Sequence, residues 1–204
     1  GIGANFILLE NNEFHHNVLE QKILEGHGHR VRNNWYHDTK VGTWFDGDNS
    51  DVIIEDNLYD NIEFEALFYE ISELGTIRRN VVNTAETCMF LSTSKNTQVY
   101  DNEFNSCWRA VTVFLQCAAL VDPNPHQIGP WDLTGNTITN NTIRMGTRAG
   151  SRASALTDAG VGQGCDAATV APYYSNAKNN NWVGNHYYMQ ALGGTEWEWN
   201  NLTR

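Results

Sequence analysis

The phrase Ile54-Glu-Asp-Asn57-Leu-Tyr59 decides the fold of this chain, because its pattern occurs five times between Leu9 and Phe104. In every copy an aliphatic residue stands three positions before an asparagine, and an aromatic or β-branched residue stands two positions after it. The asparagines are spaced 22, 23, 23 and 22 residues apart and are Asn12, Asn34, Asn57, Asn80 and Asn102. A repeat in the low twenties is typical of a solenoid, in which each repeat forms one rung.

Each phrase reads as a strand, a tight turn and a second strand. Asparagine suits the turn because it tolerates left-handed backbone angles, and stacked asparagines can bond to one another along the axis. A further alternating strand precedes most phrases by about ten residues, for example Gly42-Thr43-Trp44-Phe45 and Cys88-Met89-Phe90-Leu91. The chain lacks the Leu-x-x-Leu-x-Leu frame and the helical half of a leucine-rich repeat, so the repeat predicts an all-β solenoid.

The asparagine phrases, together with the segments 42–48, 68–72 and 90–94, resemble the right-handed parallel β-helix repeat proteins of the pectate-lyase-like superfamily. The resemblance covers residues 5–145 well and the last third poorly. It implies a right-handed parallel β-helix of roughly nine rungs. Because this fold hosts lyases, hydrolases, epimerases, phage spikes and inert fibres, the resemblance alone does not fix an activity.

We expect residues 1–204 to form a single β-helix domain with loop insertions at 117–135 and 146–181. The first insertion contains three of the four prolines, which cannot donate hydrogen bonds to a central ladder, and the second is rich in Gly, Ala and Ser. The chain starts within a repeat at Gly1, so we also expect that a native N-terminal part precedes it. An open β-helix end is a docking edge, which adds end-to-end self-association as an expectation.

The composition excludes two classes of partner. With 24 acidic and 13 basic residues the formal net charge is −11, and no basic stripe is present to neutralise nucleic-acid phosphates. No apolar run is long enough to span a bilayer, so we expect no membrane partner. We interpret Arg78, Arg79 and Arg109 as solvated or ion-paired residues.

Four cysteines are consistent with two situations. Cys88 and Cys107 lie in successive rungs, whereas Cys117 and Cys165 flank the irregular part of the last third. Either pair could be a disulfide in an oxidising compartment, and buried free thiols are the alternative. We expect a secreted or extracellular protein, as the family resemblance implies.

Alignment of the wall strands predicts a candidate site. Asp46 and Glu70 fall in one column on neighbouring rungs, and Ser92 and Phe114 continue that column. Neighbouring strands are about 4.8 Å apart, which would bring the carboxyl groups to about 5 Å, the separation that a retaining glycosidase requires. We assign Asp46 as nucleophile or stabiliser and Glu70 as proton donor. The predicted substrate-binding residues are Lys22, Trp44, Asp48, Phe68 and Tyr69.

A lyase is the alternative chemistry for the same column. Asp46, Asp48 and Glu70 would then bind calcium, and Lys22 or an arginine would take the proton. We expect no cofactor and no metal site for the hydrolase, with calcium as the ion that the acidic turn 46–51 would hold. The segment Gly26-His27-Gly28-His29 is interpreted as a solvated turn, since it has neither an HExxH helix nor a cysteine partner.

The favoured function is therefore a polysaccharide-active or oligosaccharide-active enzyme, more a hydrolase than a lyase. Two alternatives remain open at this point. One is a non-catalytic scaffold such as a fibre, spike or surface subunit, in which outward Asp and Glu are solvated charges that discourage edge pairing. The other is a glycan-binding module without turnover.

Overall fold

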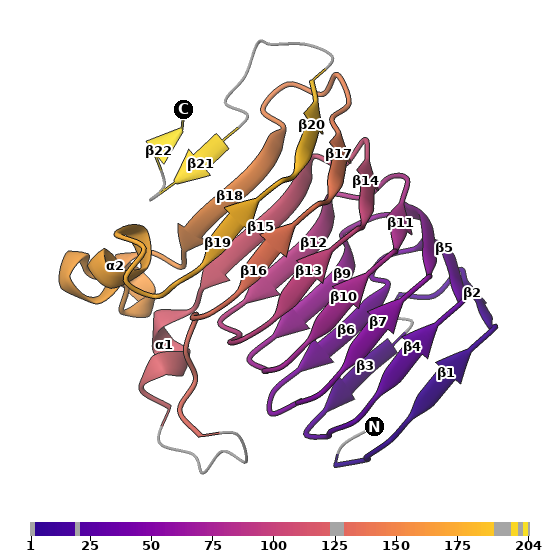
Figure 1. Cartoon of the computed structure of the whole chain (residues 1–204), viewed down its shortest axis with the longest axis horizontal. Coiled ribbons are helices and arrows are strands. Elements are labelled where there is room, and N and C mark those ends of the chain that lie inside the picture. Colours follow the sequence, from indigo (N-terminus) through magenta and orange to yellow (C-terminus); the bar gives the residue numbers. More distant parts are fainter. Residues whose placement is uncertain (1–2, 19–20, 123–128, 190–196, 200–201, 204) are drawn as a thin grey trace.

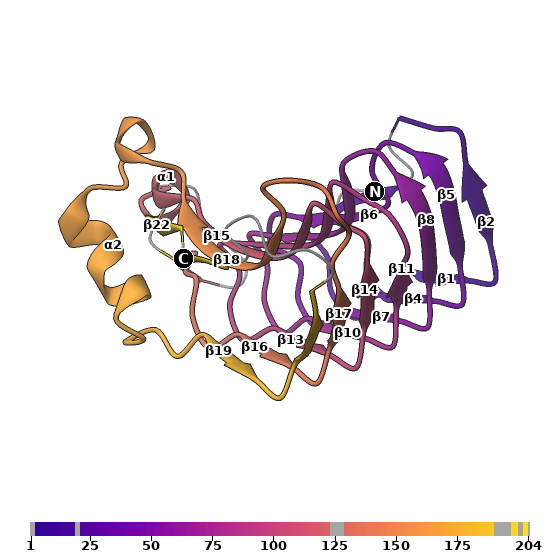
Figure 2. The ribbon, with the colours of Figure 1, turned by 90° about the horizontal axis from the view of Figure 1, so that it is seen from above.

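The computed structural model describes residues 3–18, 21–122, 129–189, 197–199 and 202–203. The chain winds into a right-handed parallel β-helix whose coils stack from the N-terminal to the C-terminal end, as Figures 1 and 2 show. Each coil passes through three sheets in the same order. The all-β solenoid predicted from the asparagine repeat is confirmed.

Three sheets make up the walls. Sheet B contains β1 (Leu8–Glu10), β4 (Arg30–Arg32), β7 (Ile53–Glu55), β10 (Thr76–Arg78), β13 (Gln98–Tyr100), β16 (Thr137–Thr139) and β19 (Asn181–Val183). Sheet C contains β2 (Glu13–His15), β5 (Trp35–Thr39), β8 (Leu58–Ile62), β11 (Val81–Val82), β14 (Glu103–Asn105), β17 (Thr142–Arg144) and β20 (His186–Tyr188). Sheet A contains β3 (Gln21–Leu24), β6 (Thr43–Asp46), β9 (Glu65–Glu70), β12 (Thr87–Ser92), β15 (Arg109–Leu115), β18 (Arg152–Asp158) and β21 (Trp197–Trp199), and β22 (Leu202–Thr203) pairs antiparallel with β21.

Seven strands stand in each of sheets B and C within the described residues, so the predicted count of roughly nine rungs is not confirmed. Two excursions interrupt the last coils. Their described residues form loops and short helices and add no rung to the solenoid. The first excursion contains α1 (Cys117–Leu120), and the second contains the 3-10 helix η1 (Val161–Gln163) and α2 (Ala167–Tyr174). Both project from the C-terminal half of the solenoid in Figure 1.

The predicted second insertion, residues 146–181, is only partly a loop. Residues 152–158 form β18, which pairs in parallel with β15 so that Val111 lies beside Ser154 and Val113 beside Leu156. Three of the central residues of β18 are small, Ala153, Ser154 and Ala155, so the strand lacks the bulky β-formers by which the earlier rungs were recognised. Backbone pairing to β15 nevertheless orders it as a strand.

An asparagine ladder runs along the corner between sheets B and C. The side-chain amide of Asn57 donates to Oδ1 of Asn80 at 3.0 Å, and Asn80 donates in turn to Asn102 at 3.0 Å. The same bond joins the other members in the order Asn12, Asn34, Asn57, and then Asn102, Asn141, Asn185. Each Oδ1 also accepts the backbone N–H of the preceding asparagine, so the buried turn polar groups are paired.

The left-handed backbone position is the residue before each ladder asparagine, not the asparagine itself. Asp56 and Arg79, for example, have φ values of 57° and 54°. The ladder asparagine is needed for its side-chain hydrogen bonds, whereas the preceding position turns the chain. Residues of several types adopt this left-handed conformation, so the residue type at that position does not mark the turn in the sequence.

The core fills the space between the three sheets and consists of the inward-facing residues of their strands. Phe14, Tyr36 and Tyr59 stack with ring centroids 4.8 Å apart along sheet C. Two disulfides, Cys88–Cys107 and Cys117–Cys165, connect the coils and excursions, so the alternative of free thiols is excluded.

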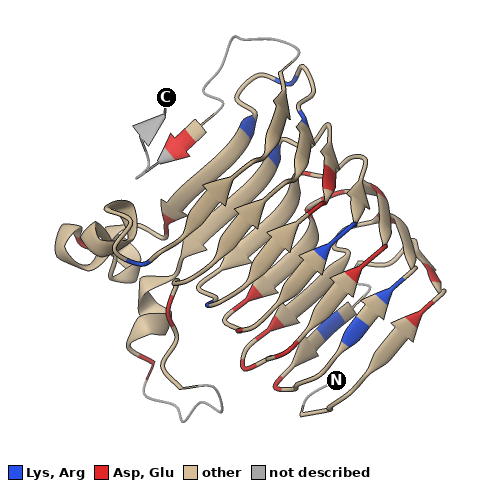
Figure 3. Ribbon diagram, viewed as in Figure 1, with Lys and Arg blue, Asp and Glu red and all other residues tan. Residues whose placement is uncertain are grey.

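Opposite charges alternate on the outer face of sheet B, where Figure 3 shows basic and acidic residues on neighbouring strands. Arg32 pairs with Glu10 at 2.7 Å, and Arg78 pairs with Glu55 at 2.7 Å. Arg79 pairs with Asp56 and Glu55, and Arg109 pairs with Glu86. The interpretation of Arg78, Arg79 and Arg109 as ion-paired residues is confirmed.

Candidate functional site

The outer face of sheet A brings the two predicted catalytic carboxylates together. Asp46 ends β6 and Glu70 ends β9, and the parallel register places them directly beside each other. Ser92 and Phe114 follow in the same column on β12 and β15. Both acidic side chains are half-buried, because they alternate with the inward residues Phe45 and Tyr69.

Lys22 neutralises Asp46. Its ammonium lies 2.8 Å from Oδ2 of Asp46, and it also stands 3.5 Å from the centre of the Trp44 ring. An opposite charge at this distance favours the ionised carboxylate. Lys22 and Trp44 therefore lie next to Asp46 and Glu70, as the alignment of the wall strands predicted.

Glu70 is held in a different environment. Trp44 donates from Nε1 to Oε2 of Glu70 at 3.0 Å, and Gln116 donates from Nε2 to Oε1. Burial, and after it the negative charge of Asp46, raise the pKa of Glu70 to about 7 against the opposing effects of the two hydrogen bonds and Lys22. Glu70 thus keeps its proton to a higher pH than an ordinary glutamate does, beside Asp46.

Gln116 was not predicted as a site residue. It follows β15 directly, two positions beyond Phe114, and its Nε2 also donates to Oγ of Ser92 at 2.7 Å. Because side chains two positions apart on a strand share a face, its position two residues after Phe114, a member of the Asp46 column, was a usable signal. Gln116 orients the carboxyl group of Glu70.

Aromatic side chains line the wall next to the carboxylates. Trp44 and Phe68 are stacked with ring centroids 4.7 Å apart and planes 8° apart. Phe68 meets Phe90 edge to face at 5.0 Å, and Phe90 lies 5.5 Å from Phe114. These four half-buried rings, here called the aromatic ladder, offer an apolar surface across four consecutive coils. Phe90 and Phe114 were not predicted as site residues, although both stand in columns of the wall alignment.

A cavity of about 290 Å³ adjoins the C-terminal end of the aromatic ladder. It is lined by Phe90, Phe114, Glu65 and Arg109, among others, and burial raises the pKa of Glu65. The wall is therefore hollowed beside the ladder on the side away from Lys22.

Two predicted substrate-binding residues do not lie on this wall. Tyr69 is fully buried, and its hydroxyl donates to the carbonyl of Glu73 at 2.7 Å. It stands between Phe68 and Glu70 in the strand, so alternation turns it into the core. Asp48 lies beyond the end of β6 with φ of 55°, in a turn where its side chain is buried. The trio Asp46, Asp48 and Glu70 is therefore not assembled on one face.

A second polar cluster lies at the start of sheet C, where His15 and His37 stand beside each other in register. Their rings are stacked with centroids 5.1 Å apart, and Nδ1 of His15 lies 2.7 Å from Nδ1 of His16. His37 contacts Oδ2 of Asp38 at 2.8 Å and Oε1 of Glu13 at 3.0 Å. These hydrogen bonds raise the pKa of His37.

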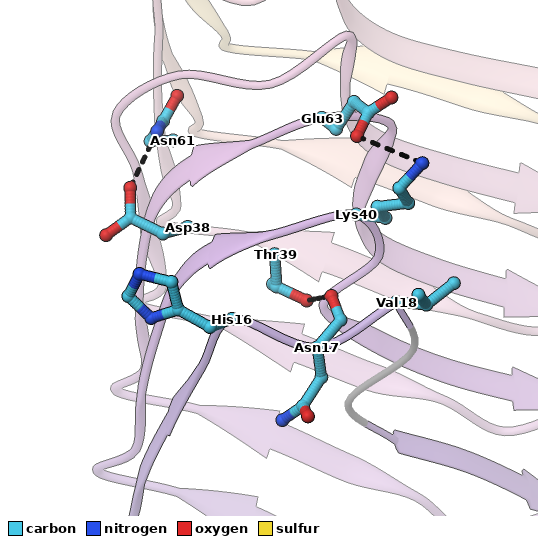
Figure 4. Close-up of a pocket in the computed structure, with 8 residues that line it drawn as sticks. All are labelled: His16, Asn17, Val18, Asp38, Thr39, Lys40, Asn61 and Glu63. Atoms are coloured by element: carbon cyan, nitrogen blue, oxygen red, sulfur yellow. Dashed lines mark hydrogen bonds and ion pairs between the residues drawn. The ribbon is translucent and has the colours of Figure 1, made fainter.

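An open cavity of about 500 Å³ borders this cluster. Figure 4 shows His16 and Asp38 on one side of it and the Lys40–Glu63 ion pair on the other. Asn61 donates to Asp38 at 2.7 Å and so fixes that carboxylate at the cavity edge. Sequence reasoning missed the cluster, although His15 and His37 each stand three residues after a ladder asparagine.

The predicted solvated turn around His27 and His29 is half correct. His27 is exposed, but His29 is fully buried and its Nδ1 accepts the backbone N–H of Ile7 at 3.2 Å. Burial lowers the pKa of His29. This buried imidazole is a core residue in the first coils.

A family model described as "Periplasmic copper-binding protein (NosD)" matches residues 3–141. The chain belongs to the NosD family. The match spans the regular coils from β1 to the corner before β17. No curated protein and no solved structure matches the chain. Membership of the pectate-lyase-like superfamily, which the sequence suggested, is not confirmed by the NosD match.

The description of the NosD family names copper, but no preformed metal site is found among the residues that the structure describes. Across the residues that the structure describes, no group of three or more His, Cys, Asp or Glu side chains is arranged to hold a metal ion. Likewise, no helix in the described ranges has the length and apolar character needed to cross a bilayer.

Proposed function

We propose that this NosD-family protein is an extracytoplasmic β-helix that binds a polysaccharide on the outer face of sheet A and cleaves its glycosidic bonds with Glu70 and Asp46. One observation carries the proposal: a carboxyl group with a pKa of about 7 lies in register beside a carboxylate that is paired with a lysine. Different environments for two neighbouring acids are the arrangement that glycoside hydrolysis requires.

The two acids have separate roles. Glu70 gives its proton to the oxygen of the leaving sugar, while the Asp46 carboxylate attacks the anomeric carbon and forms a covalent glycosyl ester. Water then attacks that ester, Glu70 takes the proton of the water, and Asp46 leaves as a carboxylate. Adjacent strands are about 4.8 Å apart, which supports a separation of the carboxyl groups near the roughly 5 Å of retaining enzymes.

The lyase alternative has weaker support. It needs Asp46, Asp48 and Glu70 around calcium, but Asp48 lies in the turn after β6 and is buried there. It also needs a neutral base, whereas Lys22 is ion-paired with Asp46. A neutral glycan is the preferred substrate class, since a chain of net charge −11 repels an acidic polymer.

The aromatic ladder supplies the binding surface. Trp44, Phe68 and Phe90 offer half-buried apolar surface beside the carboxylates, and the apolar face of a sugar ring packs on such surfaces. The adjoining cavity of about 290 Å³ would receive the next part of the glycan.

An extracytoplasmic location is supported from two sides. The family description names a periplasmic protein, and two disulfides tie the coils and excursions of this chain. Disulfides persist in oxidising compartments such as the periplasm and the extracellular space.

A panel of neutral polysaccharides tests the proposal, with release of reducing ends as the readout. The wild-type protein and the control Asp51→Asn, which changes an exposed acid in the turn after β6, should both release product. Glu70→Gln and Asp46→Asn should each reduce the rate by about 10²-fold or more with an unchanged circular dichroism spectrum.

Three other results would contradict cleavage at these residues. Glycan binding without product would identify a binding module, and neither binding nor product would identify a scaffold. Full activity in both Glu70→Gln and Asp46→Asn would place the chemistry elsewhere. End-to-end self-association, measured by light scattering, would support the scaffold function.

A second candidate function is copper binding, which the family description names. The specific observation that favours it is the pair of facing nitrogens on His15 and His16, because imidazole is a preferred ligand of copper. Equilibrium dialysis against copper(II) tests this function: a stoichiometric bound ion supports it, and no bound ion contradicts it.

A further inference from the structure

The last described coil borders a hollow at the C-terminal end of the solenoid. Its strands are β19, β20 and β21, one in each of the three sheets (Figure 1). Each strand contributes one aromatic residue to the lining of the hollow, and these are Trp182, Tyr187 and Trp197. Each of them continues an inward-facing column of the core, because it lies in register with a buried residue of the preceding coil: Ile138, Ile143 and Ser154. An aromatic side chain thus reaches the hollow from every wall.

A small residue in β18 leaves room for the hollow. Ser154 follows Met89 and Val111 in the inward column of sheet A, and its side chain is smaller than either of theirs. Because protein interiors are otherwise close-packed, the lost volume leaves space at this level. The cavity measures about 360 Å³, and Ser154 and Tyr187 line it with their hydroxyl oxygens 3.2 Å apart. The strands themselves therefore build the hollow.

The lining favours a cation that has an apolar envelope. Aromatic faces attract a ligand cation, and Trp does so most strongly. Tyr187 and Trp197 meet edge to face, with ring centroids 4.6 Å apart and planes at 75°, so these rings stand at an angle instead of stacking flat. Glu198 adds a carboxylate to the lining and also pairs with Arg152 at 3.3 Å. The other lining residues that the structure describes are neutral.

We propose that this hollow binds a quaternary or methylated ammonium group between Trp182, Tyr187 and Trp197, with Glu198 on one side. A compact, positively charged group of methyls matches aromatic side chains that arrive from three walls, and such cages are a known means of recognising quaternary ammonium ligands. A bare ammonium ion suits the hollow less well, because it is strongly hydrated. The site is separate from the wall that carries Asp46 and Glu70 and does not depend on cleavage there.

Choline chloride is the probe, and its neutral carbon analogue dimethylbutanol, which has a similar shape, is the control ligand. Titration calorimetry on the whole chain should show that the wild-type protein binds choline at least about threefold more tightly than the analogue. Trp197→Ala should weaken choline binding by about threefold to thirtyfold, the range of a cation–π contact. Trp35→Ala is the matched control and should bind choline as the wild-type protein does, because Trp35 is 41% exposed on β5 and Trp197 is 40% exposed.

A second variant separates charge from shape. Glu198→Gln removes the carboxylate with little change in volume, so it should weaken the binding of choline and leave the affinity for dimethylbutanol unchanged. Circular dichroism verifies that both variants fold, which is expected because Trp197 is exposed and Glu198 is half-buried.

Three results would overturn the proposal. The first is no binding of choline, and the second is equal affinity of the wild-type protein for choline and dimethylbutanol, which would mean an apolar hollow without preference for a cation. The third is equal choline binding by the wild-type protein and Trp197→Ala. A free solute and a lipid headgroup share this chemistry, and sedimentation with phosphatidylcholine vesicles distinguishes them. Binding to the vesicles would identify a lipid headgroup, and binding of choline alone would identify a free solute; either result supports the site.

Discussion

Asp46 and Glu70 lie directly beside each other on β6 and β9, and the pKa of Glu70 is raised to about 7. Lys22 pairs with Asp46, whereas Glu70 accepts hydrogen bonds from Trp44 and Gln116 and faces the charge of Asp46. Two acids in one column thus have different partners, which is the arrangement that the proposed acid and nucleophile need.

The raised pKa of Glu70 predicts how stability depends on pH. The folded protein holds this proton up to about pH 7, whereas the unfolded chain releases it near pH 4.5. The unfolded state therefore binds fewer protons between these values, and the contribution of Glu70 to stability falls as the pH rises through this window.

Glu70→Gln should flatten that part of the profile and raise the melting temperature at pH 8 relative to the wild-type protein. Thermal unfolding between pH 4 and 8 measures it, and Asp51→Asn, an exposed acid, is the control. Identical profiles for the wild-type protein and Glu70→Gln would show that the pKa of Glu70 is not raised.

The aromatic ladder should contribute to glycan affinity. Phe68→Ala removes the ring stacked on Trp44, so we expect binding of a neutral oligosaccharide to weaken by about 0.5–1.5 kcal/mol in titration calorimetry. Phe64→Ala is the control, because Phe64 is 38% exposed in the turn before β9 and lies off the wall. Equal losses in the two variants would place the glycan elsewhere.

The asparagine ladder should carry much of the stability of the coils. In Asn80→Ala the buried backbone N–H of Asn57 loses its acceptor, and Oδ1 of Asn102 loses one of its two donors, so we expect a loss of about 1–3 kcal/mol in urea unfolding. The exposed Asn83, which bonds to Asp60, provides the control, since Asn83→Ala should change stability by about 0.5 kcal/mol or less. If Asn80→Ala leaves the free energy of unfolding unchanged, water must replace the hydrogen bonds of the ladder.

The repeat made the fold predictable, because the asparagine side chain has the same job in every coil. The column containing Asp46 and Glu70 followed from the spacing alone. The inward direction of Tyr69 was not predicted. Because side chains alternate along a strand, an outward-facing Glu70 requires its neighbour Tyr69 to face the core. Asp48 was misplaced because the strand ends at Asp46, and strand ends are not visible in an alternating pattern.

Other features depend on contacts that no short pattern records. β18 was hidden by its small residues, and its strand state comes from pairing with β15. The histidine cluster combines residues of two coils, and the stacked pair His15 and His37 meets only through the register of β2 and β5. The role of Gln116 depends on where the chain leaves β15.

The most direct test of the account is the titration of Glu70 by carbon NMR on protein labelled in its glutamate side chains. The resonance is assigned as the one missing in Glu70→Gln. The account predicts an apparent pKa of about 7, which moves down in Asp46→Asn because the neighbouring negative charge is gone. A carboxyl group that titrates at the ordinary value near 4.5 and does not respond to Asp46→Asn would contradict the proposed acid and nucleophile pair.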